Sequence, residues 1–206
     1  MIDISFDMIR LSVKNYLIID DFFPKHICNQ LYLDALNDPT IHAKFNRYNS
    51  REFDSGRRNY SLKSISDNYV APKISFFNAE SYIRSWSFIM DNIADGVGAH
   101  NDRIAEISSE YTCNVWVTPD QCVHDSYKNG LIIFDKNITP DSPIQDLINN
   151  GRSITEFLTG VEYDLISYKC NRAVIFKSST IHKTNGVHMK PGHMNKRINY
   201  TFLYGK

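Results

Sequence analysis

Four side chains in the second half of the chain have the types and the spacing to hold a metal ion and an acidic ligand. His100 and Asp102 are two positions apart, so on an extended segment the imidazole and the carboxylate point to the same side. His182 follows a short apolar run later in the chain. Two histidines and one carboxylate can bind Fe(II) and leave its other positions open. Arg197 could pair with a carboxylate ligand through its planar guanidinium.

The segment that begins at Arg197 alternates between polar and apolar residues, as a β-strand with two different faces does. Arg197, Asn199 and Thr201 share one face, and the opposite face is apolar. Burying the polar face is costly unless it lines a polar site. The alternative is an edge strand whose polar face lies in water. The other face carries Ile198, Tyr200 and Phe202.

Three histidines near the C-terminus compete for the second imidazole of such a metal site. His182 directly follows a predicted strand, which would hold it rigidly. His188 and His193 lie in a connection that contains glycine and proline. The sequence therefore favours His182 as the ligand, and it leaves the other two to face a substrate or the solvent.

These features form an ordered series with several neighbouring segments. In chain order the series is the His100-X-Asp102 pair, the segments YTCNVWVTPD and NGLIIFD, the run NRAVIF, the histidine in SSTIH, and RINYTFLYG. The series resembles the Fe(II)/2-oxoglutarate-dependent dioxygenases, above all the prolyl-hydroxylase-like branch and small members from bacteria and phages. The resemblance covers roughly residues 97 to 205, and the N-terminal part fits only in outline.

The resemblance implies an α+β, mainly β fold, with a double-stranded β-helix core of the jelly-roll or cupin-like type. This core would occupy residues 97–206. Residues 1–96 would supply N-terminal strands, supporting helices and a candidate lid loop. A length of 206 residues suits a single domain, so one domain over residues 1–206 is expected.

The resemblance also implies a ligand set. Two imidazoles and a carboxylate would hold Fe(II), a basic residue with polar neighbours would bind the far carboxylate of 2-oxoglutarate, and an amide would contact its metal-bound end. The residues so assigned are His100, Asp102 and His182 for the metal, and Arg197, Thr201, Asn199 and Asn114 for the co-substrate. Trp116, on the same strand face as Asn114, could form a pocket wall. Both side chains could instead simply pack in the core.

The reaction implied is hydroxylation of an unactivated C–H bond in a small molecule or a peptide side chain. 2-Oxoglutarate and O2 would be consumed, succinate and CO2 would form, and ascorbate would act as a stimulant. Related halogenases carry a small residue in the place of Asp102, so hydroxylation is favoured over halogenation. Desaturation, demethylation and ring closure remain open.

Other segments predict the supporting elements. Residues 2–23 read as one or two strands, and a helix is expected from Pro24 to Asn37. Residues 38–72 read as a polar loop with a short edge strand, in which Arg51, Arg57 and Arg58 could grip an acidic substrate. Residues 78–95 predict a helix because Ile83, Trp86, Met90 and Ile93 recur at helical spacing. Residues 136–160 predict an insertion with two short helices.

Composition excludes several classes of partner. Lys plus Arg and Asp plus Glu number 23 each, so no net charge favours nucleic acid or an anionic membrane surface. No apolar run approaches the roughly 18 residues of a membrane-spanning helix. The 4 cysteines show no CxxC spacing, which suits a reducing cytoplasm. The sequence does not indicate an oligomeric state.

Two further classes stay open. One is a cupin-like metal enzyme that does not use 2-oxoglutarate, in which Arg197 is structural. The other is a non-catalytic β-helix that serves as a binding module. The first predicts metal binding without succinate formation, and the second predicts the loss of a metal ligand, which this sequence does not show.

Overall fold

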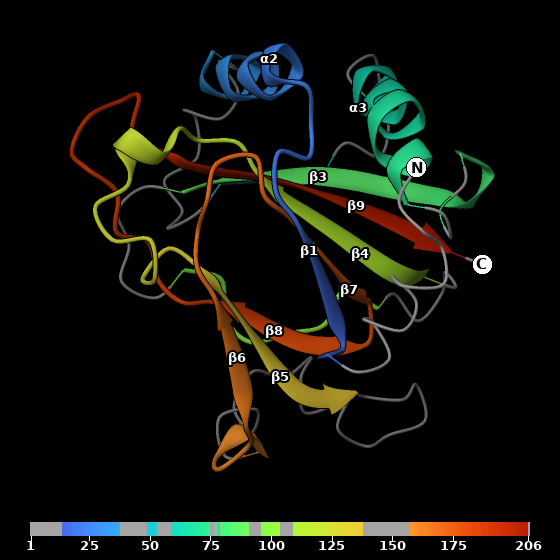
Figure 1. Ribbon diagram of the computed structural model, residues 1–206, viewed down its shortest axis with the longest axis vertical. Coiled ribbons are helices and arrows are strands. Elements are labelled where there is room, and N and C mark those ends of the chain that lie inside the picture. The colour runs from blue at the N-terminus through green and yellow to red at the C-terminus, as the bar shows by residue number, and fades with distance from the viewer. Residues whose placement is uncertain are drawn as a thin grey trace.

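Two antiparallel β-sheets form the framework of the protein (Figure 1). The computed structural model describes residues 14–37, 49–52, 59–74, 77, 79–90, 96–103, 109–137 and 157–205. Across the large sheet the strands are β1 (Tyr16–Ile19), β7 (Ala173–Lys177), β4 (Ser109–Trp116), β9 (Arg197–Gly205), β3 (Tyr82–Met90) and β2 (Asn49–Glu52). Across the small sheet they are β6 (Tyr163–Ile166), β5 (Leu131–Asn137) and β8 (Thr180–Thr184).

From β4 onward the chain passes back and forth between the sheets. β4, β7 and β9 are neighbours in the large sheet, whereas β5, β6 and β8 make up the small one. All the strand pairings are antiparallel. This rolled arrangement of two facing sheets is the predicted double-stranded β-helix.

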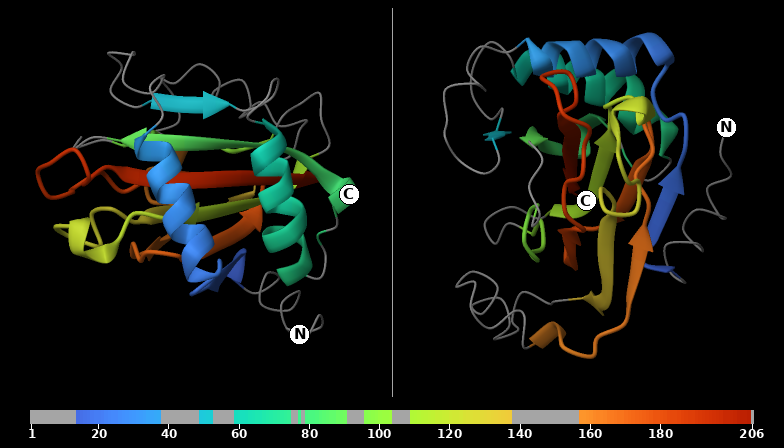
Figure 2. Two further views of the ribbon diagram at one scale, coloured as in Figure 1. Left: turned by 90° about the horizontal axis from the view of Figure 1, so that it is seen from above. Right: turned by 90° about the vertical axis from the view of Figure 1, so that its left-hand side faces the viewer.

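Helices cover the outer face of the large sheet, as Figure 2 shows from above. They are α2 (Lys25–Leu36) and α3 (Asn59–Ile65), the latter continued by a π-helical turn (Ser66–Val70) and a 3₁₀ turn (Ala71–Lys73). Shorter 3₁₀ turns lie at Ala79–Ser81 and Asp120–Cys122. Buried apolar residues of both helices pack against the sheet in one cluster, so burial holds this layer in place.

The predicted alternation of β9 is confirmed. Ile198, Tyr200 and Phe202 belong to the apolar cluster under the helices, and the Tyr200 hydroxyl donates to the Leu31 carbonyl oxygen of α2 at 2.9 Å. The polar face, which begins at Arg197, therefore points between the two sheets.

β4 is divided in the same way, as its sequence predicts. Cys113 and Val115 pack under the helices, and Trp116 joins a second cluster between the sheets. That interior cluster also contains Leu131, Ile133, Ile166, Tyr168, Val174 and Phe176.

The predicted helix from Pro24 to Asn37 is confirmed as α2, with Pro24 at its N-cap and Asn37 at its C-cap. β1 lies within the segment predicted as strands, of which residues 2–13 are outside the described part. β4, β5 and β7 overlap the segments YTCNVWVTPD, NGLIIFD and NRAVIF of the ordered series.

The predicted helix at residues 78–95 is wrong, because its described part is a short 3₁₀ turn followed by β3. Trp86 and Met90 are four residues apart, and that spacing puts two side chains on one face of a helix and also on one face of a strand. The segment YIRSWSFIM is rich in the aromatic and β-branched residues that favour strands. Pairing with both β9 and β2 decides between the two structures.

The polar loop predicted at residues 38–72 is only partly correct. Its edge strand exists as β2, but the second half is helical and covers the sheet. Leu62, Ser66, Val70 and Ile74 form a buried stripe at intervals of four, in which the Ser66 hydroxyl pairs with the Tyr204 hydroxyl at 2.5 Å. Arg57 and Arg58 lie outside the described residues, as do all of residues 38–48 and 53–58 of the predicted lid.

Two later predictions also need adjustment. β8 interrupts the long connection expected between the strands at residues 173–176 and 197–205, so His182 lies within a strand and not after one. Of the insertion at residues 136–160, Phe157 and Leu158 are helical, whereas its first predicted helix falls outside the described residues.

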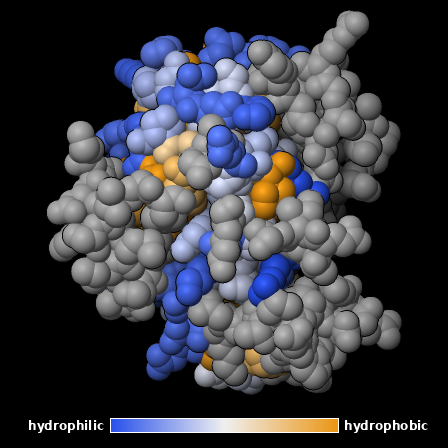
Figure 3. Space-filling view, turned by 90° about the vertical axis from the view of Figure 1, so that its right-hand side faces the viewer, coloured by the Kyte–Doolittle hydropathy of each residue, from blue (hydrophilic) through white to orange (hydrophobic). Residues whose placement is uncertain are grey.

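The described helices are all too short or too polar to cross a membrane. On the face shown in Figure 3, hydrophilic side chains predominate among the described residues, and hydrophobic ones occur in small, separate patches. Scattered apolar side chains of this kind are ordinary on a protein surface.

Candidate metal centre

Main-chain pairing sets two histidines side by side. The His100 and His182 main chains form an isolated antiparallel bridge, with N–H to O distances of 3.0 and 2.9 Å. Directly paired residues direct their side chains to the same face. The two imidazole centroids are accordingly 4.3 Å apart.

Asp102 completes a three-residue cluster. Its N–H donates to the Ser178 carbonyl oxygen at 3.0 Å, which holds the strand-like segment after His100 against the turn that precedes β8. Its carboxylate oxygens lie 3.5 Å from His100 Nε2 and 3.6 Å from His182 Nε2. One possible ligand atom from each residue lies within 4.8 Å of the others, which is a spacing that one metal ion can bridge.

The hydrogen bonds of the two rings prepare both for metal binding. His100 Nδ1 lies 2.7 Å from the Gly98 carbonyl oxygen, and His182 Nδ1 lies 3.1 Å from that of Thr180. A carbonyl oxygen only accepts, so Nδ1 must carry the proton in each ring. Nε2, the nitrogen nearer to Asp102 in each ring, is then the atom that can bind a metal, the arrangement found in metal-ligating histidines.

Electrostatics also favour a bound cation. Burial lowers the pKa of His182 to about 4, so this imidazole is neutral. Burial acts the same way on His100, but the hydrogen bond with Asp102 outweighs it and the pKa of His100 is raised. Burial by itself would raise the pKa of Asp102. The two histidines and a hydrogen bond from Thr112 outweigh burial, so the pKa of Asp102 lies below its usual range. A charged carboxylate thus stands between two imidazoles.

A buried cation lies at the other end of the same cavity. Arg197 is 1% exposed, and burial lowers its pKa to about 10, which leaves it charged at neutral pH. Its Nε donates to the Asn129 carbonyl oxygen at 3.1 Å, and its Nη1 donates to Asn199 Oδ1 at 3.0 Å. The guanidinium lies 5.7 Å from the centre of the Trp116 ring. Among the described residues no carboxylate forms an ion pair with it.

Two buried polar atoms of β4 lack partners among the described residues. Asn114 Oδ1 and Trp116 Nε1 are buried without a hydrogen bond among the described residues. Buried polar groups of native proteins are nearly always paired, so such atoms point to a missing ligand or water. Asn114 and Thr201 line the cavity, Thr201 next to Arg197 and Asn199 on the same strand face.

The cavity joins the metal cluster to the buried cation. Its walls come from β3, β4, β5, β8, β9 and the segment before Asp102. The lining residues are Trp86, Phe88, Met90, Val97, His100, Asp102, Asn114, Leu131, His182, Thr184, Arg197, Asn199 and Thr201.

All seven side chains that the sequence singles out thus line one cavity, and His188 and His193 do not. Trp116 is buried behind it and is not part of its lining. The His-Asp-His cluster can bind a metal ion. The Arg197 guanidinium and the Asn114 amide can bind the carboxylates of a small dicarboxylate beside it. The donor set therefore suits Fe(II) and 2-oxoglutarate.

Sequence reasoning missed some of the site. Trp86, Phe88 and Met90 line the cavity from β3, the segment predicted as a helix. The alternation of these large residues with Ser85 and Ser87 was the sequence pattern that could have indicated a strand. The role of Thr112 in holding Asp102 has no sequence signature, because it depends on how the segment around Asp102 meets β4.

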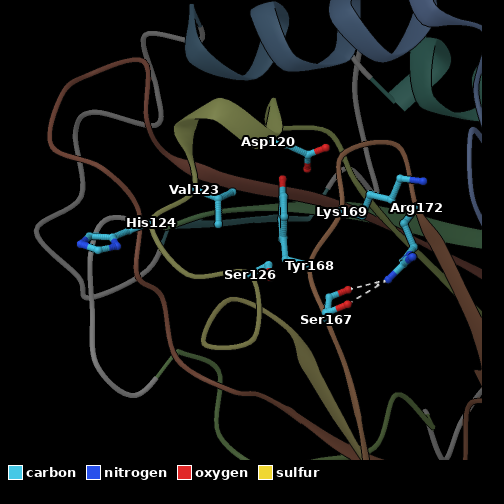
Figure 4. Close-up of a pocket in the computed structure, with 8 residues that line it drawn as sticks. All are labelled: Asp120, Val123, His124, Ser126, Ser167, Tyr168, Lys169 and Arg172. Carbon is cyan, nitrogen blue, oxygen red and sulfur yellow. Dashed lines mark hydrogen bonds between the residues drawn. The ribbon is translucent and has the colours of Figure 1, made fainter.

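A second, larger cavity lies on the surface between the connections that precede β5 and β7 (Figure 4). Several of its polar side chains already have partners. Arg172 binds Asp20 at 2.6 Å and the Ser167 carbonyl oxygen at 2.9 Å, and the Tyr168 hydroxyl donates to the Thr118 carbonyl oxygen at 2.7 Å. This cavity therefore carries no comparable chemistry.

No family model matches the sequence, and no curated protein matches it. Solved structures do match the fold. HygX from Streptomyces hygroscopicus, with nickel and 2-oxoglutarate bound, has a TM-score of 0.62 at 10% identity and covers 97% of this chain and 86% of its own. The epimerase SnoN, in complex with Fe3+, alpha ketoglutarate and nogalamycin RO, has a TM-score of 0.64 at 12% identity over 98% and 83%.

A third match is the prolyl hydroxylase from Trichoplax adhaerens, in complex with a hypoxia inducible factor peptide fragment. It has a TM-score of 0.60 at 12% identity and covers 98% of this chain and 88% of its own. At such identities the likeness shows the fold. The resemblance found in the sequence is thereby confirmed at the level of the fold: this chain is a double-stranded β-helix of the kind seen in Fe/2-oxoglutarate oxygenases.

Proposed function

We propose that the protein is an Fe(II)- and 2-oxoglutarate-dependent dioxygenase in which residues 1–206 form one domain. The observation that carries the proposal is the cavity that has a His-Asp-His cluster at one end and, at the other, a buried arginine that pairs with no carboxylate of the described residues. A dianion that chelates the metal and reaches the arginine satisfies both ends at once.

Each residue has a role in this proposal. His100, Asp102 and His182 hold the iron through Nε2 and carboxylate oxygen atoms. Arg197 binds the far carboxylate of the co-substrate by charge-assisted hydrogen bonds. The supporting polar contacts come from Asn199, Thr201 and Asn114.

The amide of Asn114 illustrates how the cavity would accept an anion. Its Oδ1 lacks a partner, and the two ends of an amide differ only in their hydrogen-bond roles. Turned by half a rotation, the amide offers an N–H to a carboxylate at the metal end. This contact would orient the co-substrate before any reaction begins.

When bound, iron and 2-oxoglutarate supply the oxidising chemistry: O2 is consumed, the 2-oxo acid becomes succinate and CO2, and one oxygen atom is available for the substrate. The protein positions these groups and excludes water. The buried apolar wall around His182, which includes Phe176 with its ring 4.6 Å away, serves the second purpose. Ascorbate would support turnover by keeping iron reduced.

The substrate we propose is a small molecule or a peptide side chain that is hydroxylated at an unactivated C–H bond. HygX has been solved with hygromycin B bound and the Trichoplax enzyme with a peptide, so the fold accommodates both kinds. SnoN is an epimerase, so outcomes other than hydroxylation stay within reach of the same scaffold. The free cysteines and ferrous iron both suit a reducing compartment such as the cytoplasm.

Two alternatives make different predictions. A cupin-like enzyme without 2-oxoglutarate would bind metal but show no response to the co-substrate. A binding module would show neither. The burial of Arg197 without a carboxylate partner among the described residues argues against both, because a buried charge in a native protein is normally paired.

The decisive experiment measures the visible absorption of the Fe(II)–2-oxo acid chelate under argon, and then succinate release on admission of air with ascorbate and a panel of metabolites and peptides. We expect both signals in the wild type and neither in His182→Ala. His188→Ala is the matched control, because this histidine lies outside the cluster, and it should retain both signals. Equal chelate formation by His182→Ala and the wild type would contradict the proposal.

A further inference from the structure

A buried asparagine lies next to the site without lining it. Asn129 is 0% exposed and belongs to the connection between β4 and β5. Its Nδ2 donates to the carbonyl oxygens of Asp125 and His188, each at 2.7 Å, and its Oδ1 accepts the His188 N–H at 2.8 Å. The side-chain amide thus pairs with both main-chain groups of one residue, and these partners define which end is oxygen.

The main chain of the same residue contacts the co-substrate cation. The carbonyl oxygen of Asn129 accepts the Nε–H of Arg197 at 3.1 Å. The other hydrogen bonds of this guanidinium go to Asn199 and Met90, which belong to the large sheet. Asn129 therefore supplies the contact that ties Arg197 to the entrance of the small sheet.

The position of this carbonyl is tightly constrained. A Cβ at Gly130 would lie 2.2 Å from the Ile166 carbonyl oxygen, so the turn packs against β6 closely enough to require glycine. The Gly130 carbonyl oxygen accepts the Asn185 N–H at 3.0 Å. The turn is therefore held between β6 on one side and the segment after β8 on the other.

This arrangement restricts the guanidinium to one rotation. With Nε bound by Asn129 and Nη1 by Asn199, Nη2 is left without a hydrogen bond among those found for Arg197. An arginine fork binds a carboxylate well only when its N–H groups are held in the right plane. A guanidinium that could rotate would lose part of this directional binding.

We infer that Asn129 is a positioning residue for the co-substrate: its side chain holds the main chain of residues 125–130 to His188, and its carbonyl oxygen thereby orients Arg197 toward the 2-oxoglutarate carboxylate. The inference rests on the proposed function. It adds that affinity for the co-substrate depends on a residue that touches neither the co-substrate nor the metal.

The test compares Asn129→Ala and Asn129→Ser with the wild type and with Asn185→Ala. Asn185 is the matched control because its Nδ2 donates to the Tyr127 carbonyl oxygen of the same turn, at 3.1 Å, without contacting Arg197. The readout is the half-saturating concentration in thermal-shift titrations under argon, first with Fe(II) alone and then with 2-oxoglutarate at saturating Fe(II).

We expect Asn129→Ala to need about tenfold more 2-oxoglutarate, while half-saturation by Fe(II) changes less than about twofold; tenfold corresponds to about 1.4 kcal/mol. Asn129→Ser should fall between Asn129→Ala and the wild type, and Asn185→Ala should match the wild type. A general structural defect would shift the responses to metal and co-substrate together.

Unchanged half-saturation by 2-oxoglutarate in a folded Asn129→Ala would overturn the inference. So would the failure of both Asn129 variants to fold, since Asn129 would then be a general structural requirement. A wild type that does not respond to 2-oxoglutarate at all would instead refute the proposed function, so the two failures are distinguishable.

Discussion

At the residue scale, the most informative group is the guanidinium of Arg197, because its burial lowers the stability of the ligand-free protein. Arg197 is buried and forms no ion pair within the described part of the chain, and burial of such a charge normally costs several kcal/mol. Its contacts with a carbonyl oxygen, an amide oxygen, a thioether and an indole ring offset only part of this cost. The protein therefore keeps a destabilising side chain at a site where a dianion would neutralise it.

This balance predicts an unusual pair of effects for Arg197→Met. Loss of charge-assisted hydrogen bonds, each of about 1.5–3 kcal/mol, should raise the 2-oxoglutarate requirement on the order of 100-fold. The ligand-free protein should be as stable as the wild type or more so, because a desolvated charge is removed. Titration with 2-oxoglutarate and urea unfolding without ligand measure the two effects.

Arg197→Lys is the control, since it keeps the charge but loses the planar fork. Its 2-oxoglutarate requirement should lie between those of the wild type and Arg197→Met. A methionine variant with wild-type co-substrate dependence and markedly lower stability would instead identify Arg197 as structural, as the cupin-like alternative requires.

At the element scale, a few main-chain contacts decide how the helical layer meets the sheet. Asn171, in the turn before β7, has φ 61° and receives the Phe23 N–H at 2.8 Å on its side-chain oxygen. Its side-chain nitrogen donates to the Phe23 carbonyl oxygen, also at 2.8 Å. Asparagine is among the few residues that adopt this left-handed backbone readily. One side chain therefore fastens the entrance of α2 to the large sheet.

Asn171→Ala should lower the free energy of unfolding by roughly 2–4 kcal/mol, from two lost hydrogen bonds of about 1 kcal/mol each and the left-handed backbone cost. Asn171→Gly loses the same hydrogen bonds but tolerates the backbone, so it should be more stable than the alanine variant by about 1 kcal/mol. Urea unfolding of the ligand-free proteins measures this. Equal stabilities for the two variants would show that backbone conformation contributes little here.

β3 shows why one element was predicted incorrectly. Its two large residues at interval four satisfy a helix and a strand equally well, and Asn78 just before the segment is a residue type that caps helices. Pairing with β9, more than a hundred residues later in the chain, is the deciding interaction. Long-range pairing of this kind is invisible to a periodicity within one window.

At the scale of the whole molecule, the proposed ligands connect parts that the chain keeps separate. His182 belongs to the small sheet and Arg197 to the large one, whereas His100 and Asp102 come from the segment between β3 and β4. A metal with a chelated dicarboxylate would therefore join both sheets. Its binding should be linked to global unfolding and not to a local loop.

Saturating Fe(II) with 2-oxoglutarate should accordingly raise the melting temperature. A ligand at 100 times its dissociation constant stabilises the folded state by about 2.7 kcal/mol. For a domain of this size, that corresponds to roughly 5–10 °C. Differential scanning calorimetry under argon measures the shift, and EDTA should reverse it. The same addition to His182→Ala should have little effect; an equal shift in that variant would place the metal elsewhere.

The sequence by itself determined the features that depend on the alternation of side chains along a strand and on the order of the motifs along the chain. Residues two apart on a strand share a face whatever the strand pairs with, so the grouping of Arg197 with Asn199 and Thr201, and of His100 with Asp102, could be read directly. The order of these motifs was enough to indicate the double-stranded β-helix, which the similarity to solved structures confirms.

Only the tertiary structure decided how these faces meet. The bridge between His100 and His182, the carbonyl oxygens of Gly98 and Thr180 that orient the imidazoles, and the carbonyl oxygen of Asn129 on Arg197 all involve main-chain atoms. Main-chain atoms are the same at every residue, so no residue type marks them in advance. Their roles follow from the register between strands, which packing of the whole chain selects.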